Sequence, residues 1–405
     1  MTHLQLHNQL KDAFSLGPPE IPLFDDLTLR NYDFVSNGTK FSGPPPGAPP
    51  PDLTERLPQG CDPTDLFLTP DAEIRQNASF RHFVVGPRGA QKASQAIILL
   101  HGLNERHWDK YLPMAVHLAR ALGKSVLLFP TAFHMNRSPA LWTDPKAMRA
   151  VSQWRKSRHP DVLESSLSNA AISLRLQADP SRFFWSGLQT HDDITALVKT
   201  IRQGLHPAFA ADATVDFFTY SIGCFIGEIL FMADEPGLFA DSRLALFCGG
   251  PIFSRMRATS KFIIDSKADD SLSAFLLQDL ADLPRLGQKD PPLAQALTET
   301  AAGRAFLSMI TPESHGHHRD SRLRALAGRV MAVGLAKDTV VPPNEIVATL
   351  QEGPFGRSKP GIEVTVADPP YPYRHEDPFP ALAKHEAPVD SAFNGIMAQV
   401  CRFLA

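Results

Sequence analysis

Short, uninterrupted apolar runs alternate with segments of helical periodicity over most of this 405-residue chain. The run QAIILLHG at 95–102 is short, ends in glycine and has no polar face, which favours a strand buried on both sides. Further strands are predicted at 79–86, 124–130, 214–221, 243–250, 329–336 and 362–368, and helices at 107–124, 190–205, 222–235, 343–351 and 389–404. This alternation predicts an α/β fold, with a mostly parallel central sheet flanked by helices.

Two long segments interrupt the alternation, at about 131–189 and 251–327. Each follows the carboxyl end of a predicted strand, where open α/β sheets place their ligand crevice. We therefore expect both to form helical cap insertions over a binding site.

The N-terminal region has a different composition. Residues 1–70 hold 12 of the 36 prolines, six of them at 44–51. Proline lacks an N–H group and fixes φ, so such a stretch is excluded from helix interiors and central strands. We expect a Pro-rich N-terminal arm at 1–70 and a single domain at 71–405.

Composition excludes several classes of function. The chain has 40 Lys and Arg against 43 Asp and Glu, a net charge of -3, without the basic patch that nucleic-acid binding requires. The four cysteines form no CxxC pair, so neither a disulfide framework nor a metal site is expected. No apolar run reaches the roughly 20 residues of a membrane span, and the first residues lack the pattern of a secretory signal. No glycine-rich nucleotide motif lies between a strand and a helix, so no cofactor is expected. We expect a cytoplasmic protein; the oligomeric state stays open.

The sequence TVDFFTYSIGCFIGEIL carries the strongest chemical signal. A predicted strand runs directly into Ser221, and a predicted helix follows at once. A sharp turn of this kind exposes the central side chain at the top of the sheet, with small residues two positions before and after it. Gly223 satisfies the later position, whereas Thr219 stands where glycine is usual. We interpret Ser221 as a nucleophile; the alternative is an ordinary helix-capping serine.

A serine nucleophile that attacks a carbonyl group needs N–H donors for the developing oxyanion. One donor is expected from Ile222, the residue after the nucleophile. The other is expected from Leu103, in the turn that follows the strand ending in His101 and Gly102.

The remaining two groups are predicted after the last two strands. Asp338 follows the strand at 329–336 and is placed to orient a histidine, although a plain turn residue is the alternative. Two histidines follow the final strand. We favour His375 as the base because its tether to that strand is shorter than that of His385, which lies next to the terminal helix.

Three polar residues, His134, Asn136 and Arg137, follow the strand at 124–130 on the expected catalytic rim. Two roles are open for them. They hold a polar group of the substrate, or they fix the cap to the sheet.

The order Ser221, Asp338, His375, with His101 and Gly102 upstream, resembles the α/β-hydrolase superfamily over roughly residues 80–405. The resemblance implies a mostly parallel sheet, a nucleophile turn and a cap. Esterases, lipases, peptidases and thioesterases share the motif, so it does not identify a substrate.

These residues predict a serine hydrolase that cleaves a carboxylic ester or related acyl bond of a small molecule. Catalysis would proceed through a Ser-His-Asp triad and an acyl-enzyme, without metal or cofactor. Two alternatives stay open: an acyltransferase that uses the same serine, and a non-catalytic relative that binds a small ligand.

Overall fold

The computed structural model describes residues 1–36, 70–89, 92–234, 236–353 and 359–405. Within these ranges nine strands form one sheet in the order β1-β2-β3-β5-β4-β6-β7-β8-β9. The six strands from β5 to β9 in this order pair in parallel, and β1, β2 and β3 add to one edge in antiparallel fashion. The strands are β1 (Glu20–Pro22), β2 (Leu27–Val35), β3 (Ser79–Pro87), β4 (Ala93–Leu100), β5 (Ser125–Phe129), β6 (Phe209–Tyr220), β7 (Leu244–Phe247), β8 (Val330–Leu335) and β9 (Glu363–Ala367).

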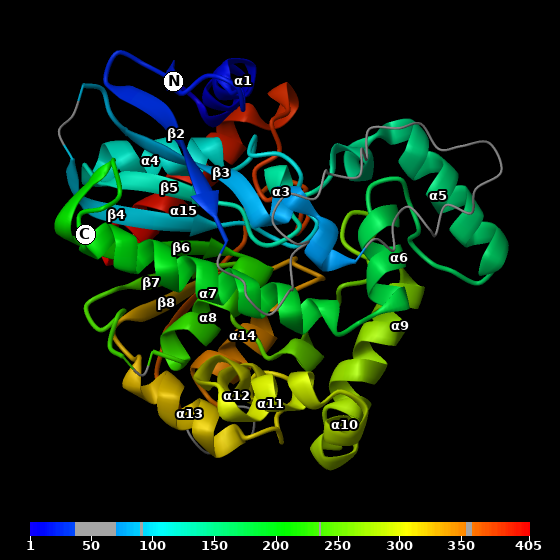
Figure 1. Ribbon diagram of the computed structural model, residues 1–405. Helices are drawn as coiled ribbons and strands as arrows, with labels where there is room; N and C mark the ends of the chain where they lie inside the picture. Colours follow the sequence, from blue (N-terminus) through cyan, green and yellow to red (C-terminus); the bar gives the residue numbers. More distant parts are fainter. Residues whose placement is uncertain (37–69, 90–91, 235, 354–358) are drawn as a thin grey trace.

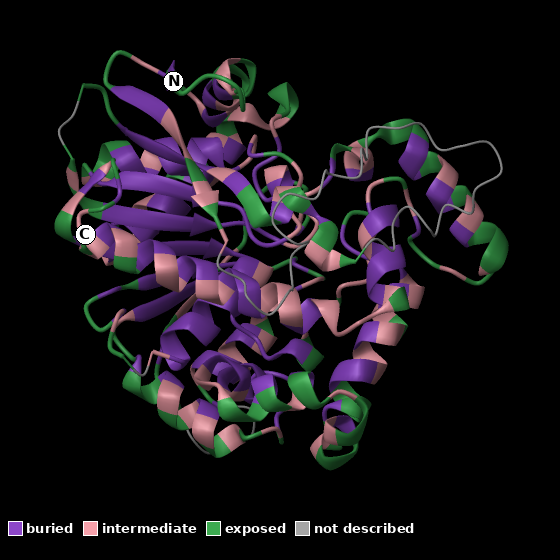
Figure 2. Ribbon diagram, viewed as in Figure 1, coloured by how far each residue is buried: buried purple, intermediate pink, exposed green. Residues whose placement is uncertain are grey.

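Helices cover both faces of the sheet (Figure 1). One face is covered by α1 (His3–Ala13), α4 (Leu112–Leu122) and α15 (Glu386–Leu404), and the other by α7 (Arg182–Arg202), α8 (Ile222–Met232) and α14 (Pro343–Leu350). In β4 successive side chains alternate between these layers: Ile97 packs with the first set, and Ile98 with the second. The buried sheet and its buried helix faces are plain in Figure 2. The predicted α/β fold, with a mostly parallel central sheet flanked by helices, is confirmed.

Two helices begin elsewhere than the periodicity predicts. Helix α4 begins at Leu112 rather than 107, with Pro113 in the first turn, where its missing N–H costs no hydrogen bond. Helix α7 begins at Arg182 rather than at 190. Thr190 does not cap it, because the Thr190 hydroxyl donates to the Ser186 carbonyl one turn earlier (2.8 Å).

The N-terminal region differs from the arm expected at 1–70. Strand β2 pairs with β3 along its whole length, from Leu27 with Pro87 to Val35 with Ser79, and Leu10 of α1 is fully buried. Residues 1–36 are therefore part of the same packed unit as the sheet. The proline run at 44–51, on which the expectation of an arm depended, lies outside the described residues.

The two expected insertions follow β5 and β7 and pack against each other beside the sheet (Figure 1). Helix α6 of the first contacts α9 of the second. Arg155 and Asp265, both fully buried, join α5 to the start of α9 by two hydrogen bonds of 2.6 and 2.7 Å. The helices of these segments are α5 (Pro145–Arg158), α6 (Ala170–Ala178), α9 (Ser266–Ala274), α10 (Leu283–Lys289), α11 (Pro291–Glu299), α12 (Ala301–Ser308) and α13 (Gly316–Ala325), and a four-residue helix α3 (Arg75–Ala78) precedes β3.

Among the described residues, no helix combines the length and the apolar character needed to cross a bilayer.

Candidate active site

Ser221 lies in a strained turn between the end of β6 and the start of α8. Its φ is 56° and its ψ −123°, a conformation that an L-residue adopts only where the surroundings enforce it. Here the Ser221 N–H donates to the Phe247 carbonyl (3.1 Å), and the Ser221 carbonyl accepts from the Cys224 N–H (2.8 Å). The turn therefore connects β6 to α8 and is tied to β7, so Ser221 stands at the carboxyl edge of the sheet.

Close backbone packing around this turn explains the small residues near it. A Cβ on Gly223 would lie 2.8 Å from the carbonyl oxygens of both Leu100 and His101, so α8 starts against the end of β4 only because residue 223 is glycine. Thr219, where glycine was expected, is fully buried and has room because it faces Gly227 of α8; a Cβ on Gly227 would lie 3.3 Å from Thr219 Cγ2. Gly227, one helical turn after Gly223, therefore leaves the space that Thr219 needs in place of the usual glycine.

Ser221, His375 and Asp338 are joined by hydrogen bonds. Ser221 Oγ lies 2.7 Å from His375 Nε2, and His375 Nδ1 lies 2.7 Å from Asp338 Oδ2. All three are largely buried. A carboxylate oxygen can only accept, so the proton lies on Nδ1 and Nε2 is left as an acceptor for the serine hydroxyl. This arrangement suits proton transfer from Ser221 to His375.

The acid and the base are both held in place. Asp338 Oδ1 accepts from the N–H groups of Val340 (2.9 Å) and Val341 (2.8 Å), which leaves Oδ2 for the imidazole. The Tyr220 hydroxyl donates to the His375 main-chain carbonyl, and the two rings stack at 5.7 Å. Burial raises the pKa of Tyr220 well above its usual value, so the phenol stays a donor.

His385, the other candidate base, lies at the end of a short 3₁₀ turn (Ala383–His385) just before α15. Its ring stacks on Tyr371 at 6.5 Å. The hydrogen bond to Ser221 comes from His375.

The turn after β4 carries the expected oxyanion donor Leu103 and is fixed from both sides. The Gly102 N–H donates to the Tyr111 hydroxyl (2.9 Å), which donates to Glu105 Oε1 (3.0 Å). His101 Nε2 accepts from the Thr131 N–H (3.0 Å), so its Nδ1–H donates to the Gly102 carbonyl (2.8 Å). Burial lowers the pKa of His101 well below its usual value, which keeps this neutral form.

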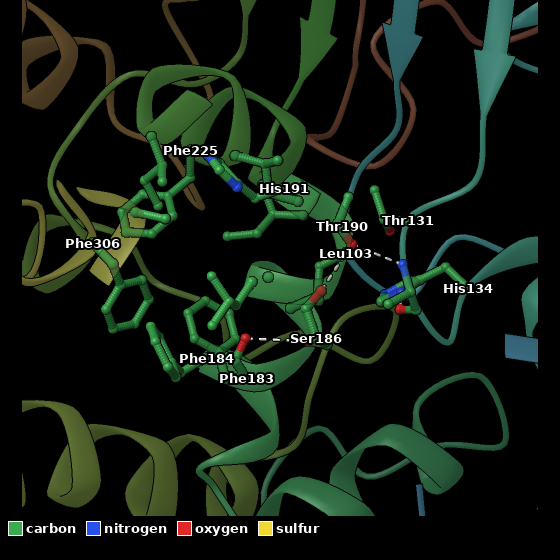
Figure 3. Close-up of a pocket in the computed structure, with 17 residues that line it drawn as sticks. Leu103, Thr131, His134, Phe183, Phe184, Ser186, Thr190, His191, Phe225 and Phe306 are labelled. Atoms are coloured by element: carbon green, nitrogen blue, oxygen red, sulfur yellow. Dashed lines mark hydrogen bonds between the residues drawn. The ribbon is translucent and has the colours of Figure 1, made fainter. Parts of the chain in front are cut away.

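Leu103 and Ile222 both border a pocket with an empty volume of about 610 Å³, its open mouth included. Within the described parts of the chain, the N–H groups of these two residues donate to no other group. Figure 3 shows the pocket, whose walls come mainly from α7, α8 and α12. Its apolar lining includes Phe183, Phe184, Leu188, Phe225, Ile226, Ile229 and Phe306.

A second pocket, of about 660 Å³ with its opening, also borders Leu103. The two share Leu103, Ala132, His134, Phe183 and Ser186. The second is charged, with Asp71, Glu105, Arg106, Arg175 and Arg182 in its walls.

The three rim residues after β5 have separate roles. Arg137 is fully buried and donates to Asn77, to the Pro130 carbonyl and to Asp193 (2.9 Å), and Asn136 donates to the Arg81 carbonyl (2.8 Å). Both fix the chain to its surroundings, which is the second of the two roles considered. His134 borders both pockets; its Nδ1 lies 2.7 Å from the Ala132 carbonyl, and among the described residues its Nε2 has no partner.

Sequence reasoning missed Tyr111, Glu105 and Lys110, which fix the turn after β4 and connect it to the loop of His375. Lys110 contacts the Glu105 carboxylate, donates to the Glu376 carbonyl (2.8 Å) and lies over the Tyr220 ring (4.5 Å). These residues occur in the segment after His101 and Gly102, but nothing in their spacing indicates that they link the turn after β4 to the loop of His375. In the described residues, no group of three or more His, Cys, Asp and Glu side chains is arranged to hold a metal ion.

Comparison with known proteins places the chain in a family without a known activity. A family model described as a family of unknown function (DUF6051) matches residues 1–405, so the chain belongs to that family. No curated protein matches it.

Solved structures with detectable similarity are distant. A cold-adapted esterase from an Arctic intertidal metagenomic library is 10% identical at a TM-score of 0.40, over 97% of this chain and 100% of that one. Carboxyl esterase 2 of the mycorrhizal fungus Tuber melanosporum is 10% identical at 0.40, over 80% and 81%. A peroxisomal α/β-hydrolase of Saccharomyces cerevisiae is 13% identical at 0.38, over 94% and 90%. Similarity of this order carries no information about the substrate.

Proposed function

We propose that this member of the DUF6051 family is a serine hydrolase that cleaves carboxylic esters or related acyl bonds. The observation that carries the proposal is the chain of hydrogen bonds from Ser221 through His375 to Asp338, with Ser221 in a strained turn at the sheet edge. Backbone strain of this kind is found mainly at functional sites. It lowers the stability of the fold, and a serine with only a structural role would not need it.

Each residue then has a role. Ser221 Oγ attacks the carbonyl carbon while its proton passes to His375 Nε2. Asp338 stabilises the imidazolium, and the N–H groups of Leu103 and Ile222 stabilise the oxyanion, with the partial positive charge at the start of α8 adding to their effect.

The cycle closes in two steps. Collapse of the tetrahedral intermediate breaks the bond to the leaving group, which takes the proton from His375 Nε2 and leaves an acyl-enzyme on Ser221. His375 then removes a proton from water as the water attacks the acyl carbonyl, and returns it to Ser221 as the carboxylic acid departs.

Hydrolysis of p-nitrophenyl esters of increasing acyl length tests the proposal. We expect turnover by the wild type and its loss in Ser221→Ala, by about 10⁶ in kcat, because the nucleophile is gone. Ser254→Ala, at an exposed serine, is the matched control and should retain activity. Circular dichroism and thermal unfolding would establish that both variants are folded. Activity of Ser221→Ala within tenfold of wild type would refute the mechanism.

A further inference from the structure

We propose that the substrate has two unlike parts: an apolar acyl group, held in the pocket lined by phenylalanines, and a negatively charged leaving group, held by the arginines of the second pocket. This rests on the proposed function, since it assigns the two pockets to the two sides of the scissile bond. The pockets meet at Leu103, one of the two proposed oxyanion donors.

The first pocket suits the acyl group because it borders both oxyanion donors, Leu103 and Ile222, and continues along α8 past Phe225 and Ile229. Ser221 does not itself line this pocket, but it directly precedes Ile222 of the wall, so an acyl group attached to Ser221 begins beside it.

The hydroxyl groups of Thr190 and Ser186 in the wall of this pocket are already satisfied, whereas His134 Nε2 has no partner among the described residues. The Thr190 hydroxyl donates to the Ser186 carbonyl (2.8 Å) and accepts from the Ala132 N–H (3.0 Å). The Ser186 hydroxyl donates to the Phe183 carbonyl (3.1 Å). Figure 3 shows these bonds between residues of the wall; most of the remaining lining is aromatic rings and aliphatic carbons, with His134 and His191 as polar rings among them. Burial lowers the pKa of His134 to about 4, so this ring is neutral. A charged group would lose its hydration in this pocket and gain little from a neutral imidazole, so the pocket favours an uncharged, apolar acyl group.

The second pocket has an excess of positive charge. Arg106, Arg175 and Arg182 border it. Asp71 is the carboxylate near both Arg175 and Arg182, and Asp179 Oδ2 lies 3.5 Å from Arg182 Nε, so three guanidinium groups face two carboxylates. Glu105 is the other acid in its walls, and its carboxylate is neutralised by Lys110.

Two of these guanidinium groups have spare donors. Arg106 donates to the Ser168 carbonyl (2.5 Å) and has no carboxylate partner among the described residues. Arg182 Nη1 is buried without a hydrogen-bond partner in the same parts of the chain, 3.6 Å from the nearest Asp71 oxygen. A carboxylate or phosphate of the substrate would supply the missing acceptors.

His375 does not line the second pocket, but the wall of this pocket is connected to the loop of the base. Glu105 in its wall binds Lys110, and Lys110 donates to the carbonyl of Glu376, the residue after His375 (2.8 Å). The leaving group must lie near His375 Nε2 to take its proton. With the acyl group assigned to the first pocket, the anionic part of the substrate is the alcohol or thiol that departs.

Three hexanoate esters of one phenol framework test the inference. They carry a carboxylate (4-hydroxybenzoate), a neutral isostere (4-hydroxybenzamide) or a cation (4-hydroxybenzyltrimethylammonium) on the leaving group. We expect kcat/KM for the anionic ester to exceed that for the neutral one by about tenfold, the worth of a charge-assisted hydrogen bond, and the cationic ester to be the poorest.

A double variant, Arg106→Gln with Arg182→Gln, should lower kcat/KM for the anionic ester about tenfold more than for the neutral ester. Arg402→Gln, at an exposed arginine of α15, is the matched control and should keep the preference. Turnover through Ser221 with no preference for the anionic ester, or with a preference that survives the double variant, would overturn this inference alone. Turnover of none of the three esters would overturn the proposed function and this inference with it.

Discussion

At the scale of single residues, the site depends on backbone positions that leave no room for a side chain. Gly223 is the sharpest case, because a Cβ there would meet two main-chain carbonyl oxygens at 2.8 Å. Main-chain carbonyl oxygens cannot move aside as the end of a side chain can. The second of them belongs to His101, which precedes the turn of the oxyanion donor Leu103.

Gly223→Ala should therefore reduce both stability and activity. We expect a loss of about 1–3 kcal/mol in the free energy of unfolding, as for other overpacked sites, and a disproportionate fall in kcat because the turn after β4 shifts. Gly395→Ala in α15 is the control: nothing lies within 4 Å of the added Cβ, and the free energy of unfolding should rise by about 0.5–1 kcal/mol. Urea unfolding and p-nitrophenyl ester turnover measure the two effects. Equal behaviour of both variants would show that the close approach at Gly223 is unimportant.

Asp338 is a second single residue on which the mechanism depends, because it holds the proton of His375 on Nδ1. Asp338→Asn keeps the size of the side chain, but the amide NH₂ group would then face His375 Nδ1 as a donor. Nδ1 would have to accept, so the ring proton would move to Nε2, which could no longer accept the proton of Ser221. We expect kcat to fall by about 10⁴ with little change in KM. A fall of less than tenfold would remove Asp338 from the mechanism.

At the scale of elements, the loop between β9 and α15 decides which histidine reaches the serine. The short tether to β9 favoured His375, and the structure has His375 Nε2 at 2.7 Å from Ser221 Oγ while His385 stacks on Tyr371 at the start of α15. The prolines at 378 and 380 separate the two.

Two single variants assign the base. His375→Ala should lose activity to the same extent as Ser221→Ala, whereas His385→Ala should keep most of it. The measurement is kcat/KM on one p-nitrophenyl ester for all three proteins. The reverse result would transfer the role of base to His385.

Helix α8 carries a second feature of chemical interest, the fully buried Glu228. Neither of its carboxyl oxygens has a hydrogen-bond partner among the described residues. Burial therefore raises the pKa of Glu228 well above its usual value, and the folded protein holds this side chain protonated. The unfolded chain releases that proton at an ordinary pKa, so this residue makes folding less favourable as the pH rises above about 4.5.

Replacement of Glu228 by methionine should remove that pH dependence. We expect Glu228→Met to increase the free energy of unfolding at pH 8, with the gain shrinking toward pH 5 by up to about 1.4 kcal/mol per pH unit. Urea unfolding at pH 5, 6.5 and 8 measures it, with Glu363→Met, at an exposed position of β9, as the control. A gain that is the same at all three pH values would mean that the carboxyl group is not held protonated by the fold.

At the scale of the whole molecule, the sequence predicts the central sheet well and its surroundings less well. Runs such as ILL in β4 have no polar face, so burial on both sides is the only consistent arrangement, and it places β4 inside the sheet. Strand β2 was missed because LTLRNYDFV has only a partial alternation, next to a region whose prolines suggested an extended arm. Pairing with β3 stabilises it, and the paired residues lie between 44 (Val35 with Ser79) and 60 (Leu27 with Pro87) positions further along the chain.

The candidate site, like the fold, was predictable from the sequence only in part. The order of Ser221, Asp338 and His375 along the chain was enough to predict that their side chains meet, because each follows the carboxyl end of a parallel strand. The pockets were not predictable, since Phe183, Phe225 and Phe306 come from three helices whose packing depends on both insertions. The periodicity of one helix does not indicate that its apolar face will form a pocket wall together with two other helices.

Covalent labelling with a fluorophosphonate, followed by peptide mass spectrometry, tests the central claim most directly. The probe reacts with a serine only where a base removes the hydroxyl proton and donors stabilise the charge on the phosphoryl oxygen. The proposed mechanism predicts one adduct, on Ser221, formed rapidly by wild type, slowly or not at all by His375→Ala, and absent from Ser221→Ala. A folded wild-type protein that remains unlabelled, or that carries the adduct on a different residue, would contradict it.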